Sequence, residues 1–201
     1  MNRSESKEIL PLSYFLLRSV LGFGLVCLVV FATVAFGQRW MYQHLGLAGA
    51  YSVWALLFVG LGGWALNPLA EGFTTRLTFF LTFGVAFLTY AVCWISAYFS
   101  LGGRIGEWVG SLAGSVAFGL VLTVAHRVWS RCARIALTLF LCHSVGYFVG
   151  EAVHHWVTGV RGMILWGLCY GLGFGLGLGY ALYQAQRRYP SGARLTTQSK
   201  T

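Results

Sequence analysis

Six long apolar runs constrain this sequence more than any other feature. Each is about 20 residues long, the length that a helix needs to cross the hydrocarbon core of a bilayer. The runs cover residues 12–36, 45–66, 77–99, 105–125, 135–153 and 163–182. The chain is 57% hydrophobic and only 9% charged, and a soluble core of this size could not hide so much apolar surface.

The runs therefore predict an all-α integral membrane protein with six transmembrane helices. Every connection between the runs is short, so we expect neighbouring helices to form three antiparallel hairpins. We divide the chain into a cytoplasmic N-terminal segment (1–11), a transmembrane domain (12–185) and a basic tail (186–201). The tail is polar, and we expect it to be disordered.

The distribution of Lys and Arg predicts that both termini lie in the cytoplasm. The two termini and the second and fourth loops carry 11 of the 14 Lys and Arg, whereas the other loops carry only Arg39, Arg104 and Arg161. Cytoplasmic flanks are enriched in positive charge. We therefore expect a multi-pass protein of the cell inner (plasma) membrane, with basic flanks against anionic lipid headgroups. Without a soluble domain, the basic balance gives no reason to expect a nucleic-acid partner.

Glycine recurs at every fourth position in two of the runs, which is the spacing of one helix face. The two rows are Gly106, Gly110 and Gly114 in the fourth run, and Gly167, Gly171, Gly175 and Gly179 in the sixth. A face without side chains lets another backbone approach closely, so the rows predict a glycine zipper between the fourth and sixth helices. A homo-oligomer or a partner membrane subunit is the alternative contact for these faces.

Few ionisable side chains fall within or beside the runs, and a charge inside a bilayer is costly enough to mark them as functional candidates. His143 lies midway along the fifth run. It could relay a proton or bind haem iron, or it could be a neutral imidazole that hydrogen-bonds a neighbouring helix. Glu107 and Glu151 lie at predicted outer ends. Together with His143 they are the candidates for binding a substrate or a proton.

Three further histidines, His44, His154 and His155, are candidate metal ligands at the predicted outer surface. On a helix, Glu151 would lie within reach of His154 and His155, and carboxylate with imidazole suits zinc or iron. No established motif such as HExxH is present, however. The alternative is a hydrated interfacial set balanced by nearby arginines. The sequence indicates no particular cofactor.

No sequence motif identifies a reaction. The chain contains no Asp, no P-loop and no GxSxG, which argues against Ser-His-Asp catalysis and Asp-based phosphoryl transfer. We therefore favour a protein that is not an enzyme. The prediction is a transport or permease-type protein, or a subunit of one, that moves a small solute. The alternatives are a non-catalytic accessory or structural subunit of a larger membrane complex, and a membrane enzyme with a metal or haem site.

Overall fold

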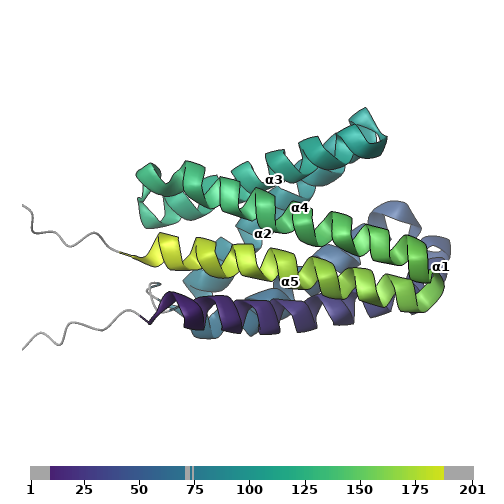
Figure 1. Ribbon diagram of the computed structural model, residues 1–201, viewed down its shortest axis with the longest axis horizontal. Coiled ribbons are helices and arrows are strands. Elements are labelled where there is room, and N and C mark those ends of the chain that lie inside the picture. The colour runs from purple at the N-terminus through teal and green to yellow at the C-terminus, as the bar shows by residue number, and fades with distance from the viewer. Residues whose placement is uncertain (1–9, 71–72, 74, 188–201) are drawn as a thin grey trace, which may run out of the picture.

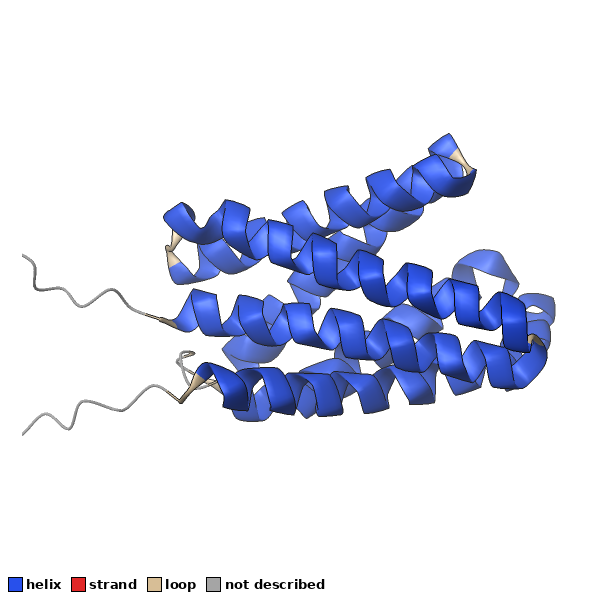
Figure 2. Cartoon of the chain, in the orientation of Figure 1, coloured by secondary structure: helices blue, strands red, loops and turns tan. Residues whose placement is uncertain are grey.

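The computed structural model describes residues 10–70, 73 and 75–187, and within that part 94% of the structure is helical and no strand occurs (Figure 2). The long helices are α1 (Leu12–Leu66), α2 (Arg76–Leu101), α3 (Gly103–His126), α4 (Cys132–Val157) and α5 (Gly159–Gln186). Two short 3₁₀ segments, Asn67–Leu69 and Trp129–Arg131, precede α2 and α4. The helices run along the long axis, and the described chain begins and ends at the same end of the bundle (Figure 1). Most of the predicted N-terminal segment and tail lies outside the described residues.

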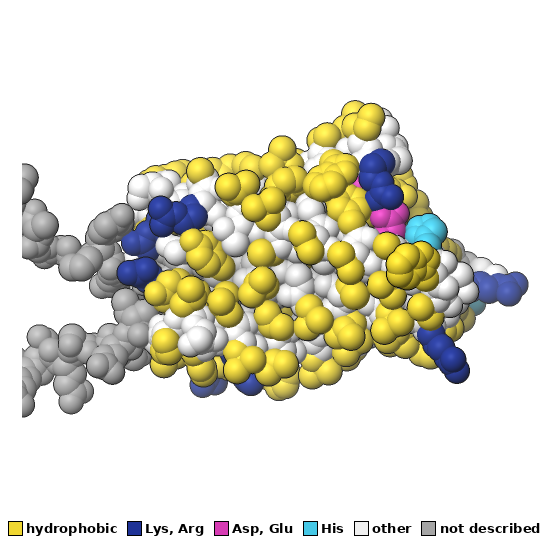
Figure 3. Space-filling model, in the orientation of Figure 1, with side chains coloured by type: hydrophobic (Ala, Val, Ile, Leu, Met, Phe, Trp, Pro, Cys, Tyr) yellow, Lys and Arg dark blue, Asp and Glu magenta, His cyan; other side chains and the backbone are white. Residues whose placement is uncertain are grey.

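All five long helices of the described chain are apolar and long enough to cross a membrane. Their most apolar stretches have mean hydropathies from 1.4 to 2.5. Large apolar side chains also cover the outside of the bundle between its two ends (Figure 3), among them Leu17, Leu21 and Leu25 on α1. A soluble monomer rarely exposes so continuous an apolar surface, so this outer face is suited to lipid.

The first helix is not one straight rod, because its backbone breaks at Gly46. Gly46 has φ 68° and ψ −179°, a conformation that is essentially restricted to glycine. The part of α1 after the break folds back along the part before it. A Cβ on Gly22 would lie 3.3 Å from the carbonyl oxygen of Ala65, and the rings of Phe23 and Phe58 are 6.0 Å apart. The sequence predicted a loop over 37–44, but the helix continues through these residues and one glycine makes the turn.

Replacing Gly46 with alanine is expected to destabilise the protein by about 1–3 kcal/mol, the cost of forcing a side chain into this backbone region. Nothing lies within 4 Å of the added Cβ, so the effect would come from the backbone alone. Detergent-induced unfolding followed by circular dichroism measures it. Gly60→Ala is the control, because Gly60 is helical and also has open space around its Cβ position. Alanine is the better helix former, so Gly60→Ala should be neutral or stabilising. Equal losses in both variants would contradict the assignment.

The glycine row of α5 packs against α1, and the two helices run antiparallel. Gly167 faces Phe31, and Gly171 faces Cys27 and Gly24. Further along the row, Gly175 faces Ser19 and Val20, and Gly179 faces Phe15 and Ser19. The Ser19 hydroxyl also donates a 2.7 Å hydrogen bond to the carbonyl oxygen of Gly175. Two further glycines of α5, Gly173 and Gly177, face α4 instead. Helix α5 therefore packs closely against both α1 and α4.

The glycine row of α3 packs against α2. Added Cβ atoms on Gly106, Gly110 and Gly114 would lie about 3 Å or less from backbone atoms of Tyr98, Trp94 and Tyr90, respectively. The predicted zipper between the fourth and sixth runs is therefore wrong about the partners, because the α3 row faces α2 and the α5 row faces α1. Spacing identifies a face that admits close packing, but every neighbouring helix offers backbone to such a face, so spacing alone does not identify the partner.

Candidate functional site

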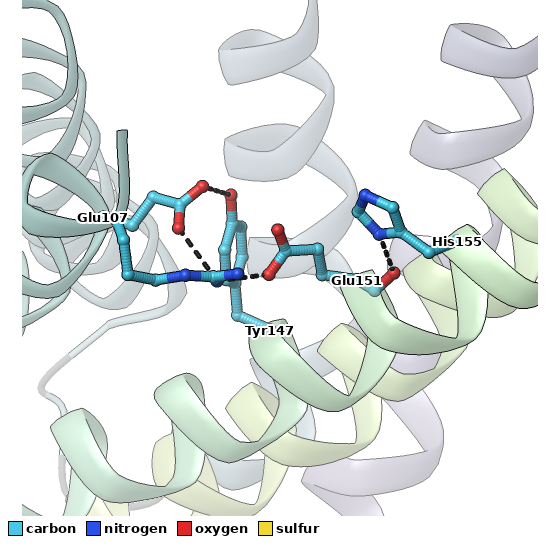
Figure 4. A network of polar contacts seen from close by, with 5 residues as sticks. Glu107, Tyr147, Glu151 and His155 are labelled. Carbon is cyan, nitrogen blue, oxygen red and sulfur yellow. Dashed lines mark hydrogen bonds and ion pairs between the residues drawn. The ribbon is translucent and has the colours of Figure 1, made fainter. Parts of the chain in front are cut away.

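A polar network joins α3 to α4 at the end of the bundle opposite the described chain ends (Figure 4). Arg104, in the first turn of α3, donates through Nη1 to Glu107 Oε2 at 3.0 Å and to Glu151 Oε2 at 2.5 Å. The Tyr147 hydroxyl, one turn before Glu151 on α4, donates to Glu107 Oε1 at 3.3 Å. The structure therefore brings together Glu107 and Glu151, the two carboxylates singled out in the sequence, around one guanidinium.

This network is exposed on its basic side and shielded on its acidic side. The Arg104 side chain is 57% exposed, whereas Glu107 and Glu151 are 13% and 16% exposed. Two carboxylates and one guanidinium leave a formal charge of −1. Charge-assisted hydrogen bonds to a shared cation allow the two acids to lie close together. The same end of the bundle carries basic, acidic and histidine side chains in Figure 3.

A groove of about 660 Å³ runs between α3 and α4 beside this network. Apart from Arg104, Glu151 and His155 at its polar end, its walls are mainly apolar, with Trp108 and Phe148 as the largest side chains. The rings of Trp108 and Phe148 are 4.4 Å apart, and the Arg104 guanidinium lies 5.0 Å from the Phe148 ring. The groove opens on the outer face of the bundle, where lipid or a partner helix would lie.

A second cavity, of about 340 Å³, lies between α1, α2, α4 and α5. Its α2 residues, 87–98, and its α5 residues, 163–170, belong to the halves of those helices that lie away from the described chain ends. Twelve of its twenty lining residues are aromatic: Phe31, Tyr42, Tyr51, Trp54, Phe58, Phe87, Tyr90, Trp94, Tyr98, Tyr147, Trp166 and Tyr170. Among the residues that the structure describes, no Lys, Arg, Asp or Glu lines it. We call this space the aromatic cavity.

His143 lies in the wall of the aromatic cavity and is only 1% exposed. Its Nε2 atom and the Tyr90 hydroxyl share a hydrogen bond of 2.5 Å, while its Nδ1 atom has no partner within the described chain. Its ring stacks on Tyr147, at 5.8 Å between centroids, and meets Tyr170 and Phe174 edge-on. This arrangement fits the alternative in which His143 is a neutral imidazole bonded to a neighbouring helix.

Three tryptophans of the cavity wall also have an indole N–H group without a hydrogen-bond partner among the described residues. These groups belong to Trp54, Trp94 and Trp166, and each Nε1 atom is buried. An indole nitrogen can only donate, and the part of the chain that the structure describes supplies no acceptor to these three groups. The Cδ1 atoms beside two of these nitrogens, in Trp94 and Trp166, pack against Gly110 and Gly150, so the nitrogens are enclosed by protein. The cavity is a candidate ligand site because aromatic side chains from four helices surround it.

The predicted metal ligands do not converge. His44 donates through Nδ1 to the Trp40 carbonyl oxygen, and His155 donates through Nδ1 to the Glu151 carbonyl oxygen, each within its own helix. His154 stacks on Trp166 at 5.5 Å, and its Nδ1 atom has no partner. Among the residues that the structure describes, no group of three or more His, Cys, Asp or Glu side chains could hold a metal ion. These three histidines therefore form no metal centre within the described chain.

The aromatic cavity was not predicted from the sequence, although the sequence contains a signal for it. Tyr90, Trp94 and Tyr98 recur at every fourth position of α2, and Trp166 and Tyr170 do so on α5. Such stripes lie on one helix face, yet the same spacing is typical of ordinary packed cores. Contacts between the aromatic side chains of different helices would distinguish a cavity wall from an ordinary core. A sequence alone does not show those contacts.

No protein-family model matches the chain, and neither a curated protein nor a solved structure does so. A fold class does not by itself determine function, which depends on the geometry and chemistry of a site such as the aromatic cavity and its polar neighbours.

Proposed function

We propose that this protein is a small-solute transport or permease-type membrane protein, or a subunit of one, and that the aromatic cavity is its solute site. The cavity is the observation that carries the proposal. It lies between four helices, its volume of about 340 Å³ is suited to a small molecule, and its mainly aromatic wall includes the hydrogen-bonded pair of Tyr90 and His143. Small-molecule sites commonly combine aromatic walls with a few polar groups in this way.

Six membrane crossings are part of the proposal. The break at Gly46 divides α1 into two arms, 12–45 and 47–66, each long enough for one crossing. With α2 to α5 this makes six, which returns the chain to the side on which it began. We propose the cytoplasm of the inner (plasma) membrane for that side, from the distribution of Lys and Arg. A reporter fused after Thr201 that was active only on the external side would contradict this orientation.

Exposed tryptophans at both ends of the bundle support its placement across a bilayer. Trp40 and Trp156 lie near the end that holds the polar network, and Trp64 and Trp129 lie near the other end. All four side chains are exposed. Indole rings prefer the interface between hydrocarbon and water, so two such belts indicate where the two membrane surfaces lie.

Filling the aromatic cavity is expected to abolish solute accumulation. Ala91 lines the cavity, and Ala91→Phe would place a ring in it. Vesicles with the wild-type protein, incubated with a metabolite extract and analysed by untargeted mass spectrometry, should accumulate at least one compound several-fold over empty vesicles. Ala91→Phe should lose that difference, because the added ring occupies the space of the solute.

The matched control is Ala125→Phe, which adds the same ring at an exposed position of α3 outside the cavity. It should behave as the wild type does. Glu107→Gln and Glu151→Gln test whether the polar network contributes to entry, since Tyr147 belongs both to that network and to the cavity wall. If no compound distinguishes wild-type from empty vesicles, the protein does not transport on its own.

The groove between α3 and α4 favours a second candidate function, an accessory subunit of a larger membrane complex. It is about 660 Å³, lies on the outer face and ends at a polar network, features that would suit a helix of another protein. Mass spectrometry of proteins co-purified from native membranes distinguishes the two. A stable partner present in stoichiometric amounts would favour the accessory role.

A further inference from the structure

The wall of the aromatic cavity is rich in side chains that attract cations. Nine of its twelve aromatic residues are Trp or Tyr, and the negative faces of such rings attract positive charge. Several rings stand at steep angles to one another: Tyr42 and Tyr51 each meet Trp54 at 76°, and Phe58 meets Tyr170 at 67°. Rings set in this way present their faces in several directions, as in the aromatic cages that bind quaternary ammonium groups.

The polar network of α3 and α4 brings negative charge to this wall. Tyr147 lines the cavity, and its hydroxyl donates to Glu107 at 3.3 Å. Glu107 and Glu151 both pair with the guanidinium of Arg104, so these three groups carry a formal charge of −1. A phenol that donates to a carboxylate is polarised by it, and its ring becomes a better partner for a cation.

Positive charges near the cavity are more exposed than these acids. Within the described chain, no Lys or Arg lines the cavity. Arg39 and Arg161, at the same end of the bundle, are exposed, so water and salt screen them. Glu107 and Glu151 are largely shielded, and shielded charges are screened less. The cavity therefore favours a cation, whereas an anion would be repelled by the acids and by the ring faces.

The wall suits a quaternary ammonium better than a primary one. A primary ammonium has three N–H donors, and the described residues that line the cavity include no carboxylate to accept them. A quaternary ammonium has no N–H group, so ring faces are sufficient partners for it. The volume of about 340 Å³ lies at the lower end of the range for small-molecule sites, which suits a compact ligand.

From these observations we infer that the aromatic cavity binds a small organic cation of the quaternary ammonium class. The inference rests on the proposed function, because it names the class of solute for the same cavity. The aromatic rings contact the cation directly. Glu107 acts through the Tyr147 phenol and is a positioning residue rather than a direct contact.

Three probes of similar shape and different charge test the inference. Phenyltrimethylammonium is a permanent cation, tert-butylbenzene is its uncharged isostere, and benzenesulfonate is an anion on the same ring. Binding is measured by equilibrium dialysis against the full-length protein in an uncharged maltoside detergent, because phosphatidylcholine would itself supply a quaternary ammonium. Specific binding is the part that Ala91→Phe removes and Ala125→Phe retains. Ala55→Phe, at another alanine of the cavity wall, provides a second blocked variant if Ala91→Phe does not fold.

We expect phenyltrimethylammonium to bind about tenfold more tightly than tert-butylbenzene, the effect of a desolvated cation–π contact, and benzenesulfonate to bind most weakly. Equal or tighter binding of tert-butylbenzene would overturn the inference and make the cavity an apolar site. Tighter binding of benzenesulfonate, or specific binding of none of the three, would overturn it as well. Cation binding by a protein that accumulates no compound in vesicles would instead overturn the transport function and leave the inference standing.

Glu107→Gln tests the contribution of the polar network separately. It removes one negative charge and should weaken the binding of phenyltrimethylammonium several-fold, while the binding of tert-butylbenzene stays unchanged. A merely structural loss would weaken both probes alike, and that result would overturn the role assigned to Glu107. Unchanged binding of the cation would overturn it too.

Discussion

Replacing Gly173 with alanine is expected to destabilise the bundle by about 3 kcal/mol, the upper end of the usual cost of overpacking. The added Cβ would lie 2.6 Å from the Cys142 carbonyl oxygen and 2.7 Å from the Gly146 Cα atom. Both are backbone atoms of α4, so no side chain can rotate away to make room. Gly146 faces α5 just as closely, since its own Cβ would lie 2.7 Å from the Cys169 carbonyl oxygen. The two helices would have to separate.

Unfolding of the purified protein by increasing mole fractions of a denaturing detergent, followed by circular dichroism, measures this loss. Gly37→Ala is the control, because its Cβ would meet only the Met41 Cε atom at 3.6 Å, an ordinary contact. Helix propensity favours alanine at both positions, so that term cannot explain a difference between them. If Gly173→Ala is as stable as Gly37→Ala, α4 and α5 do not pack as described.

The same contacts bear on how this protein could associate with others. The glycine rows of α3 and α5 are occupied by helices of the same chain. Substituting Gly171 or Gly175 by leucine would therefore damage the fold itself, and the loss of a partner in such a variant would not identify an interface. A homo-oligomer or a complex with another subunit would have to use a different surface. The groove between α3 and α4 is the candidate for that surface.

Much of the helical architecture could be predicted because the length of an apolar run has a direct physical meaning in a bilayer. The expected run 77–99 corresponds to α2, Arg76–Leu101, and 105–125 corresponds to α3, Gly103–His126. Turns were harder to predict. Gly37 and Gly49 are as plausible as Gly46 in the sequence, yet both remain helical. Nothing local distinguishes them, since the break depends on where the two arms of α1 can pack.

The candidate site could be predicted only in part, for a related reason. Single polar residues in an apolar chain stand out, so Glu107, Glu151 and His143 could be proposed as candidates from the sequence. Their partners did not stand out. Arg104 was grouped with the outer basic residues but not identified as the bridge between two acids. Tyr90, which shares a hydrogen bond with His143, lies 53 residues away from it in the chain. The aromatic cavity forms only where four helices approach one another, and the distances between those helices cannot be read from the sequence.

A double-mutant cycle on Tyr90 and His143 is expected to show that the two side chains are coupled by about 1 kcal/mol or more. Tyr90→Phe removes the hydroxyl from His143 Nε2, and because Nδ1 has no partner, neither ring nitrogen would then be paired. A buried polar group without its hydrogen bond costs about 1–3 kcal/mol. Once His143 is leucine, the loss of the Tyr90 hydroxyl should cost much less.

The two single substitutions should also differ from one another. In His143→Leu the Tyr90 hydroxyl keeps a second hydrogen-bonding neighbour, Tyr170, whereas in Tyr90→Phe the imidazole keeps none. The free energies of unfolding of the wild type, the two single variants and Tyr90→Phe/His143→Leu complete the cycle. If the effects add to within about 0.5 kcal/mol, the pair is uncoupled, and His143 is held by ring packing alone. Coupling would instead mean that the imidazole is part of the polar framework that holds α2 against α4 beside the aromatic cavity.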